Sequence, residues 1–393
     1  MTKKAALFSI LFWLFSPVSQ AEQKTFFHPG VFISYKQLQF VRYSLTEEPW
    51  QTAYVNILKD NRAQLSYKPT AHKIVECGPF SKPDIGCTDE TRDSQAAYTQ
   101  AILWRLTGDA RYAENVRNIL NAWANTLTEG HTNSNAPLQA AWAAQMFTRA
   151  AEIIKYSYKE WPPAEKYIVS KWLTEQYLPN IRAMFNNKCN NSNWHASGIE
   201  AMANIAVFTD NQTLFTEAIY KWRGLVNAYI YLTSDGPRPN NPVGCSLPPT
   251  EIEKKWYYPA TYIDGLALES CRDFEHTAYG LAAIINVAET ARLQGIDLYQ
   301  DQESLAEERL TKAMELHSSY ENRQPGLGRL CKNSEHFNNS VKGTFEVGFN
   351  HYAMRLGMNL PQTEQFLKLS RPTKGYFHYL WETLTHGLTG DVR

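Results

Sequence analysis

The sequence predicts an all-α fold in which helical hairpins stack and close into an (α/α) barrel or toroid, with long loops lining a cleft. Amphipathic segments of helical length follow one another along most of the chain. Three-residue turns at 107–109 and 209–211 join neighbouring segments into hairpins. The alternating pattern of strands is scarce, and no fixed repeat period favours an open solenoid.

The expected helices begin after an irregular N-terminal region. They span residues 94–106, 110–127, 137–158, 163–177, 195–208, 212–232, 266–293, 304–320, 343–356 and 376–388. Each carries apolar residues at helical spacing and ends near Gly, Pro, Asn or Asp. The longest irregular region, residues 234–261, is rich in Pro, Asn and Tyr. Long loops in compact domains are often functional, so we expect this one to cover the cleft.

The first 21 residues have the pattern of a secretory signal peptide. Lys3 and Lys4 precede an apolar run at 5–15, and small residues lead to Ala21. The run is too short to cross a bilayer comfortably. We therefore expect residues 1–21 to be removed, and residues 22–393 to form a single periplasmic or secreted domain, because no linker divides them.

The charge and the motifs of the chain exclude several classes of binding partner. Lys+Arg and Asp+Glu both number 39, so the chain has no general attraction to nucleic acid. A polyanion would have to be held by a local cluster. No later segment is apolar enough for stable membrane insertion, and no Walker A, HExxH or dinucleotide motif occurs. We expect no metal and no cofactor, and the sequence leaves the oligomeric state open.

Six cysteines in an exported chain can form disulfides. Cys77 and Cys87 bracket a Gly/Pro-rich loop and are the expected pair. The remaining four allow three pairings, between which the sequence does not choose: they are Cys189, Cys245, Cys271 and Cys331. Their spacing does not match a zinc site.

The segment CNNSNWHASGIEA, residues 189–201, is the first candidate site. Asn190, Asn191 and Asn193 can donate hydrogen bonds to a carboxylate without adding charge. Trp194 offers a flat face for a sugar ring, and His195 adds an imidazole. Asn and Ser are also common at helix starts, so capping is the alternative for any single residue, whereas the whole cluster favours function.

The segment CRDFEHTAYG, residues 271–280, is the second candidate. On one continuous helix Arg272, His276 and Tyr279 would share a face, at i, i+4 and i+7. An arginine can clamp a carboxylate, and histidine and tyrosine can exchange protons. The alternative for Arg272 is an ion pair with Glu269 or Asp273.

Two weaker candidates complete the set. His351 lies in GFNHYAMRLG, and Tyr258 lies in the long loop with other tyrosines. Either residue could line the cleft and contact sugar, although core packing is the commoner fate of a lone histidine or tyrosine.

Three segments resemble the alginate-lyase-like polysaccharide lyases, which are (α/α)-toroid enzymes that cleave uronic-acid polymers by β-elimination. They are residues 93–123, 190–211 and 264–299, of which the last two are specific. The resemblance implies that an Asn, often with an Arg, neutralises the uronate carboxylate. A His or Tyr then removes the C5 proton, and a Tyr protonates the leaving oxygen at C4.

Carried onto this sequence, the resemblance makes Asn193 the neutraliser, Arg272 its partner, His276 the base and Tyr279 the acid. From the chemistry of the residues themselves, we expect substrate to be bound by Asn190, Asn191, Trp194, Tyr258 and His351. The roles of base and acid stay open among His195, His276, Tyr258 and Tyr279. The implied partner is an acidic polysaccharide such as alginate or glucuronan.

Two other functions fit an exported helical toroid. One is an inverting (α/α)-barrel glycoside hydrolase, which needs two carboxylates roughly 6.5–9.5 Å apart. The other is a periplasmic polysaccharide-binding protein without catalysis. Unsaturated products distinguish a lyase from both.

Overall fold

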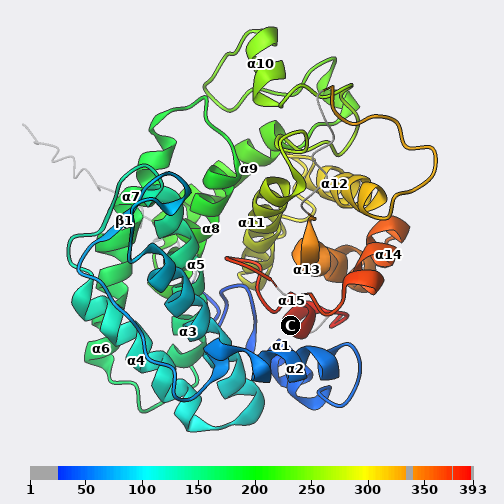
Figure 1. Ribbon diagram of the computed structural model, residues 1–393. Helices are drawn as coiled ribbons and strands as arrows, with labels where there is room; N and C mark the ends of the chain where they lie inside the picture. Colours follow the sequence, from blue (N-terminus) through cyan, green and yellow to red (C-terminus); the bar gives the residue numbers. More distant parts are fainter. Residues whose placement is uncertain (1–24, 333–339, 374, 391–393) are drawn as a thin grey trace, which may run out of the picture.

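A computed structural model describes residues 25–332, 340–373 and 375–390 of the chain. The expected signal peptide at 1–21 lies outside the described residues. An inner row of helices forms the centre of the fold (Figure 1). It consists of α3 (Cys87–Thr107), α5 (Ala136–Lys155), α8 (Asn193–Phe208), α11 (Phe274–Leu293) and α13 (Glu346–Phe349). Each packs against the next in this order.

An outer row of helices covers the inner row. It consists of α4 (Ala110–Thr126), α6 (Pro163–Trp172), α7 (Leu178–Ala183), α9 (Gln212–Tyr229), α12 (Ala306–Glu321) and α14 (Pro361–Ser370). α4 packs on α3, α7 on α5 and α9 on α8. Each inner helix is followed along the chain by one or two outer helices, so the fold is the expected (α/α) toroid of stacked hairpins. Short 3₁₀ turns occupy Asn61–Ala63, Pro79–Ser81, Met184–Asn186, Thr233–Asp235 and Lys342–Phe345, and π turns occupy Leu173–Tyr177 and Asn350–Arg355.

The hairpin turns follow from their residues. Gly108 ends α3 in a left-handed conformation at φ 77°, which glycine adopts without strain. Asp109 then caps α4, and its carboxylate accepts a hydrogen bond from the backbone N–H of Arg111. Asn211 caps α9 in the same way through the N–H of Leu214. Both predicted turns are confirmed.

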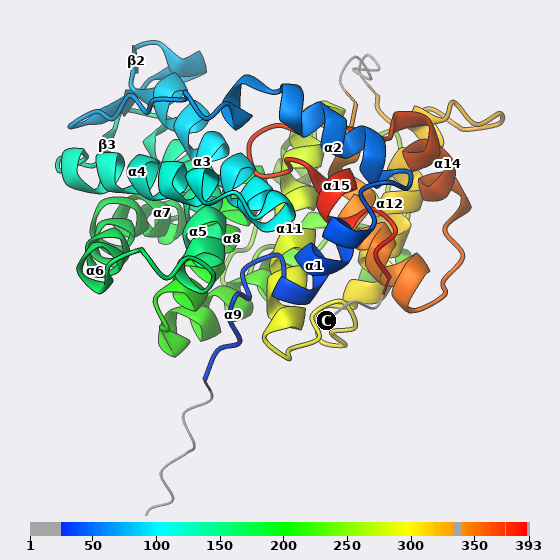
Figure 2. The same cartoon turned by 90° about the horizontal axis from the view of Figure 1, so that it is seen from below.

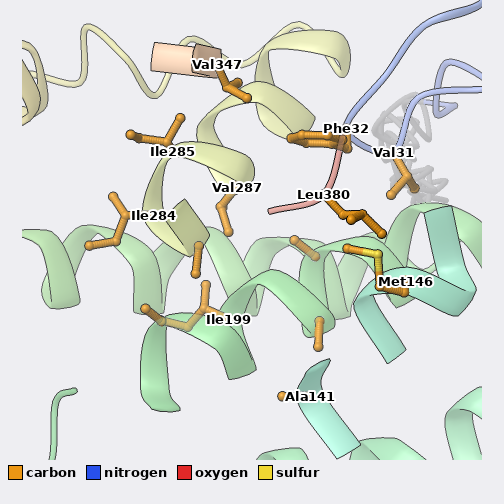
Figure 3. Packing of buried hydrophobic residues seen from close by; sticks show 14 of the residues in the cluster. Val31, Phe32, Ala141, Met146, Ile199, Ile284, Ile285, Val287, Val347 and Leu380 are labelled. Carbon is orange, nitrogen blue, oxygen red and sulfur yellow. The ribbon is translucent and has the colours of Figure 1, made fainter. Parts of the chain in front are cut away.

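The inner helices bury apolar side chains on the faces that meet. Figure 3 shows Met146 of α5, Ile199 of α8, and Ile285 of α11 next to Val347 of α13, all within one apolar layer. Phe32, from the segment before α1, also enters this layer and is fully buried. Burial of this continuous core is the main driving force for the arrangement of the helices.

The two ends of the described chain meet on one side of the toroid. α1 (Tyr35–Tyr43) and α2 (Trp50–Lys59) both pack on α15 (Glu382–His386) (Figure 2). The sequence prediction of an irregular start was wrong over α1 and α2. The predicted helix at 376–388 was too long, because Phe377 and Trp381 have left-handed backbones that interrupt a helix.

A small sheet lies beside the start of α3. β1 (Val75–Cys77) pairs antiparallel with β2 (Asp84–Ile85) and parallel with β3 (His131–Thr132). The disulfide between Cys77 and Cys87 closes the intervening loop, which confirms the expected pair. The other bridges are Cys189–Cys245 and Cys271–Cys331.

Two segments near the candidate site differ from their predictions. The helix expected at 266–293 starts only at Phe274, because the Asp273 side chain caps it by accepting the N–H of His276. The long loop contains a short helix, α10 (Pro249–Lys255), which stands apart from the ring in Figure 1. No helix in the described part of the chain is long and apolar enough to cross a membrane.

Candidate active site

The two segments singled out in the sequence meet around a cavity of about 680 Å³. Its walls come from the segment that leads into α8 (residues 190–195), from α10 and the turn after it (residues 251–258), and from the approach to α11 (residues 268–272). The cavity therefore brings together an arginine, asparagines, a tryptophan, a histidine and two tyrosines.

A buried carboxylate holds Arg272 at this cavity. The Glu269 side chain is 1 % exposed, and its Oε1 accepts a hydrogen bond from Arg272 Nη1 at 3.1 Å. The same carboxylate accepts the backbone N–H and the Nδ2 of Asn193, both at 2.8 Å, and the hydroxyl of Tyr229 at 2.9 Å. Arg272 is 36 % exposed, so its guanidinium is fixed on one side and open on the other.

This network corrects two expectations. Arg272 lies before the cap of α11, so Arg272, His276 and Tyr279 do not share one helix face. Asn193 is fully buried, with its amide donating to Glu269, and it does not line the cavity. The Asn193 amide fixes the Glu269 carboxylate, and this carboxylate in turn binds Arg272. In this conformation Asn193 therefore positions Arg272.

The neighbouring asparagines do reach the cavity. Asn190 and Asn191 both line it, and Trp194 lies beside them. Asn191 is anchored because its Nδ2 donates to the backbone oxygen of Ala228 at 2.7 Å. Asn190 is exposed, so its amide is better placed than that of Asn193 to meet a ligand carboxylate, whereas Asn191 is 5 % exposed and has only its second amide hydrogen to offer.

His195 is a buried, neutral member of the cavity wall. Its Nε2 lies 3.0 Å from the carbonyl oxygen of Met184 and so carries the proton, which leaves Nδ1 to accept from the Ser192 hydroxyl at 3.1 Å. Burial lowers the pKa of His195 to about 4, and the charge of Lys255 adds to the effect. Because both ring nitrogens of His195 already make hydrogen bonds, its role in this conformation is to form part of the cavity wall.

Two tyrosines after α10 form another part of the cavity wall. Tyr257 and Tyr258 have left-handed backbones, with φ of 56° and 59°, a costly conformation for bulky residues that is typical of functional sites. The Arg272 guanidinium lies 6.0 Å from the centre of the Tyr257 ring. Burial raises the pKa of Tyr257, and Arg272 acts against this rise. Tyr258 lines the cavity and is 40 % exposed.

His276 forms a dyad with Asp273 at the start of α11. The ring Nδ1 lies 2.7 Å from Asp273 Oδ2, so it donates to the carboxylate and leaves Nε2 as the proton acceptor. Burial opposes ionisation of Asp273, but hydrogen bonds from His276 outweigh it and lower the pKa of Asp273. A carboxylate that orients an imidazole in this way is the arrangement of a general base. His276 is not among the residues that line the cavity; it lies in the first turn of α11, just after the Arg272 wall, and is 28 % exposed.

Tyr279 lies behind His276 in an aromatic cluster. The two rings meet edge to face at 5.6 Å, and the ring of Phe377, which stacks on Trp142, lies 5.6 Å from that of Tyr279. Tyr279 is 6 % exposed, and burial, followed by the charges of Tyr379 and Glu275, raises the pKa of its phenol. The cluster therefore supports His276 from the core side.

His351 lies elsewhere. It belongs to the π turn Asn350–Arg355, is 4 % exposed, and stacks on Tyr299 with ring centres 3.8 Å apart. It does not line the cavity. Its surroundings are those of a packed core histidine.

Several residues of the site were not singled out from the sequence. Lys254 and Lys255 line the cavity, and Trp142 and Phe377 complete the cluster behind His276. Their positions depend on contacts between distant segments, which no local pattern reveals. Asp273 carried a signal, since an Asp three residues before a His at a helix start can bind both the backbone and the ring.

A protein built as an (α/α) toroid, with an arginine, amides, an imidazole and phenols around one cavity, has the architecture of a polysaccharide lyase. The family model described as Alginate lyase matches residues 83–325, which is more than half of the chain. The chain therefore belongs to the alginate lyase family and is a polysaccharide lyase. No curated protein matches the sequence significantly.

Solved structures share the fold. Alginate lyase A1-III complexed with a tetrasaccharide is 17 % identical, with a TM-score of 0.65 over 94 % of this chain and 98 % of that one. Alginate lyase A1-III from Sphingomonas species A1 is 16 % identical, with a TM-score of 0.61 over 94 % and 99 %. An alginate lyase from Bacteroides ovatus is 15 % identical, with a TM-score of 0.60 over 92 % and 100 %.

Proposed function

We propose that this lyase is exported and cleaves a uronic-acid polymer, such as alginate or glucuronan, by β-elimination at the Arg272 cavity. The observation that carries the proposal is the guanidinium of Arg272, which Glu269 holds at the cavity wall beside Asn190 and Asn191. These are the donors that a uronate carboxylate requires. The signal-peptide pattern at 1–21 and the three disulfides support export.

The first step is neutralisation of the uronate carboxylate. Arg272 and the asparagine amides donate hydrogen bonds to it, and these bonds strengthen as negative charge develops when the C5–H bond breaks. Trp194 provides the flat face on which the sugar ring rests. The C5 proton becomes acidic enough for a side-chain base to remove.

The second step is the elimination. Nε2 of His276 takes the C5 proton, the C–H electron pair forms the C4=C5 double bond, and the C4–O bond breaks. The phenol of Tyr258 gives its proton to the leaving oxygen. We assign the acid to Tyr258 because it borders the cavity, whereas Tyr279 is buried with a raised pKa behind His276.

A hydrolytic function is less well supported. An inverting hydrolase needs two independent carboxylates, one as acid and one as base. The cavity holds Glu251 and Glu269, and Glu269 is committed to Asn193, Tyr229 and Arg272. A carboxylate that accepts four hydrogen bonds is a poor general base, so the pair that hydrolysis needs is missing from this cavity.

The test is a panel of uronans incubated with the purified protein. A lyase produces ultraviolet absorbance from the double bond conjugated to the carboxylate. Arg272→Ala should lose this signal, and Arg111→Ala should keep it, because Arg111 pairs with Asp109 at the exposed start of α4. Reducing ends formed without absorbance would support the hydrolase, and binding without turnover would support the binding protein.

A further inference from the structure

A second cavity, of about 300 Å³, adjoins the first. Asn190, Asn191 and His195 line both cavities, so the segment that leads into α8 and the first turn of this helix form their shared wall. The far wall of the second cavity consists of α9 and residues 242–244. A chain leaving the Arg272 cavity past Asn190 would therefore enter it.

The lining of the second cavity is cationic. It includes Lys188 and Lys221 and contains no Asp or Glu. Lys221 Nζ lies 3.8 Å from Glu217, but Arg182 binds the same carboxylate at 2.7 Å and shares its charge. In the described part of the chain no carboxylate lies within ion-pair distance of Lys188. Two cations thus line a largely apolar cavity that holds no carboxylate of its own to compensate them.

The walls of this cavity are closely fitted. The disulfide Cys189–Cys245 joins the residue after Lys188 to the residue after Gly244. Gly244 has a left-handed backbone at φ 77°, and a Cβ placed there would lie 3.1 Å from Lys188 Cδ. A Cβ at Gly224 would lie 2.9 Å from Val243. The glycine at 244 therefore lets the backbone pass against the Lys188 side chain, which places this side chain at the cavity wall.

We infer that the second cavity binds the carboxylate of a further uronate unit in the same polymer chain, between Lys188 and Lys221. This inference rests on the proposed function. It extends that function by predicting that the best substrates are long enough to reach the second cavity and carry a carboxylate there. Tyr220, 66 % exposed at the rim, offers its ring to the sugar. The Lys188 and Lys221 contacts act on the ground state and the transition state alike, so they contribute to KM and leave kcat unchanged.

The test is the double variant Lys188→Gln/Lys221→Gln, assayed on the polymer and on uronate oligomers of increasing length. Loss of two surface charge contacts should raise KM for long substrates by roughly 5- to 30-fold at unchanged kcat. Short oligomers, which fill only the Arg272 cavity, should be cleaved as by the wild type. Lys171→Gln is the matched control, because Lys171 is an exposed lysine on α6 that faces Glu175.

The outcomes separate the two proposals. Unsaturated products with the same KM in the double variant and the control would overturn the second site and leave the proposed function intact. A wild type that forms no unsaturated product would overturn the function. In that case calorimetric binding of a uronate oligomer decides the second site: weaker binding by the double variant supports it, and equal binding overturns it.

Discussion

The pair formed by Arg272 and Glu269 allows catalysis to be separated from stability. In Arg272→Ala the buried Glu269 carboxylate loses its cationic partner but keeps three donors, two from Asn193 and one from Tyr229. Losing one partner of a buried group costs about 1–3 kcal/mol of unfolding free energy. If Arg272 also binds the uronate carboxylate, kcat should fall roughly 10²- to 10³-fold, the usual effect of removing a donor that stabilises developing charge.

The second substitution, Glu269→Gln, removes the buried charge that Arg272→Ala leaves unpaired. Asn193 can adapt, because its Oδ1 is buried without a hydrogen-bond partner and can accept from the introduced amide when the Asn193 side chain flips. The double variant should therefore unfold within about 1 kcal/mol of the wild type, as expected when both members of a buried pair are replaced.

The assay combines urea unfolding with initial rates of unsaturated product on one uronan. We expect the double variant to regain stability and to stay as inactive as Arg272→Ala. Recovery of the rate together with the stability would refute the reasoning, because Arg272 would then be only a counter-ion for Glu269.

Three further predictions concern the surroundings of the cavity. Asp273→Asn should keep the cap of α11 but free the His276 ring, so kcat should fall roughly 10²-fold and its pH profile should shift; an unchanged profile would argue against the dyad. His195, with a pKa lowered to about 4, binds fewer protons folded than unfolded, so its stabilising contribution is complete above about pH 6.5. About 3 kcal/mol of unfolding free energy is lost through His195 as the pH falls to 4. The urea midpoint should therefore fall less on acidification in His195→Asn than in the wild type. Cys189→Ser/Cys245→Ser opens a loop of 56 residues and should cost about 4 kcal/mol in the loop-entropy model; an unchanged thermal midpoint would contradict this.

The helical framework could be predicted because its signals are local. Apolar spacing and the caps at Gly108, Asp109 and Asn211 determine where the hairpins turn, and the structure has those turns. The start of α11 was missed because residues 266–268 are apolar and no Gly or Pro breaks the helical pattern at 266–273. The cap at Asp273, which depends on its side chain folding back to His276, overrides that pattern.

The sequence predicted which residue types line the site, but only part of how their side chains are arranged. Of the two ion pairs that the sequence allowed for Arg272, the structure forms the one with Glu269. The burial of Asn193 and the contribution of Tyr257 depend on how α10 and α11 approach α8, and such long-range packing has no local sequence pattern. The cavity lining could therefore be predicted by residue type, and the orientation of each side chain could not.

The most direct test of the central claim is the mass balance of the cleavage products from a defined uronate oligomer. A β-elimination at the Arg272 cavity adds no water, so the masses of the two products should sum to that of the substrate, with one product absorbing in the ultraviolet. Products whose masses sum to the substrate plus one water, without absorbance, would contradict the account.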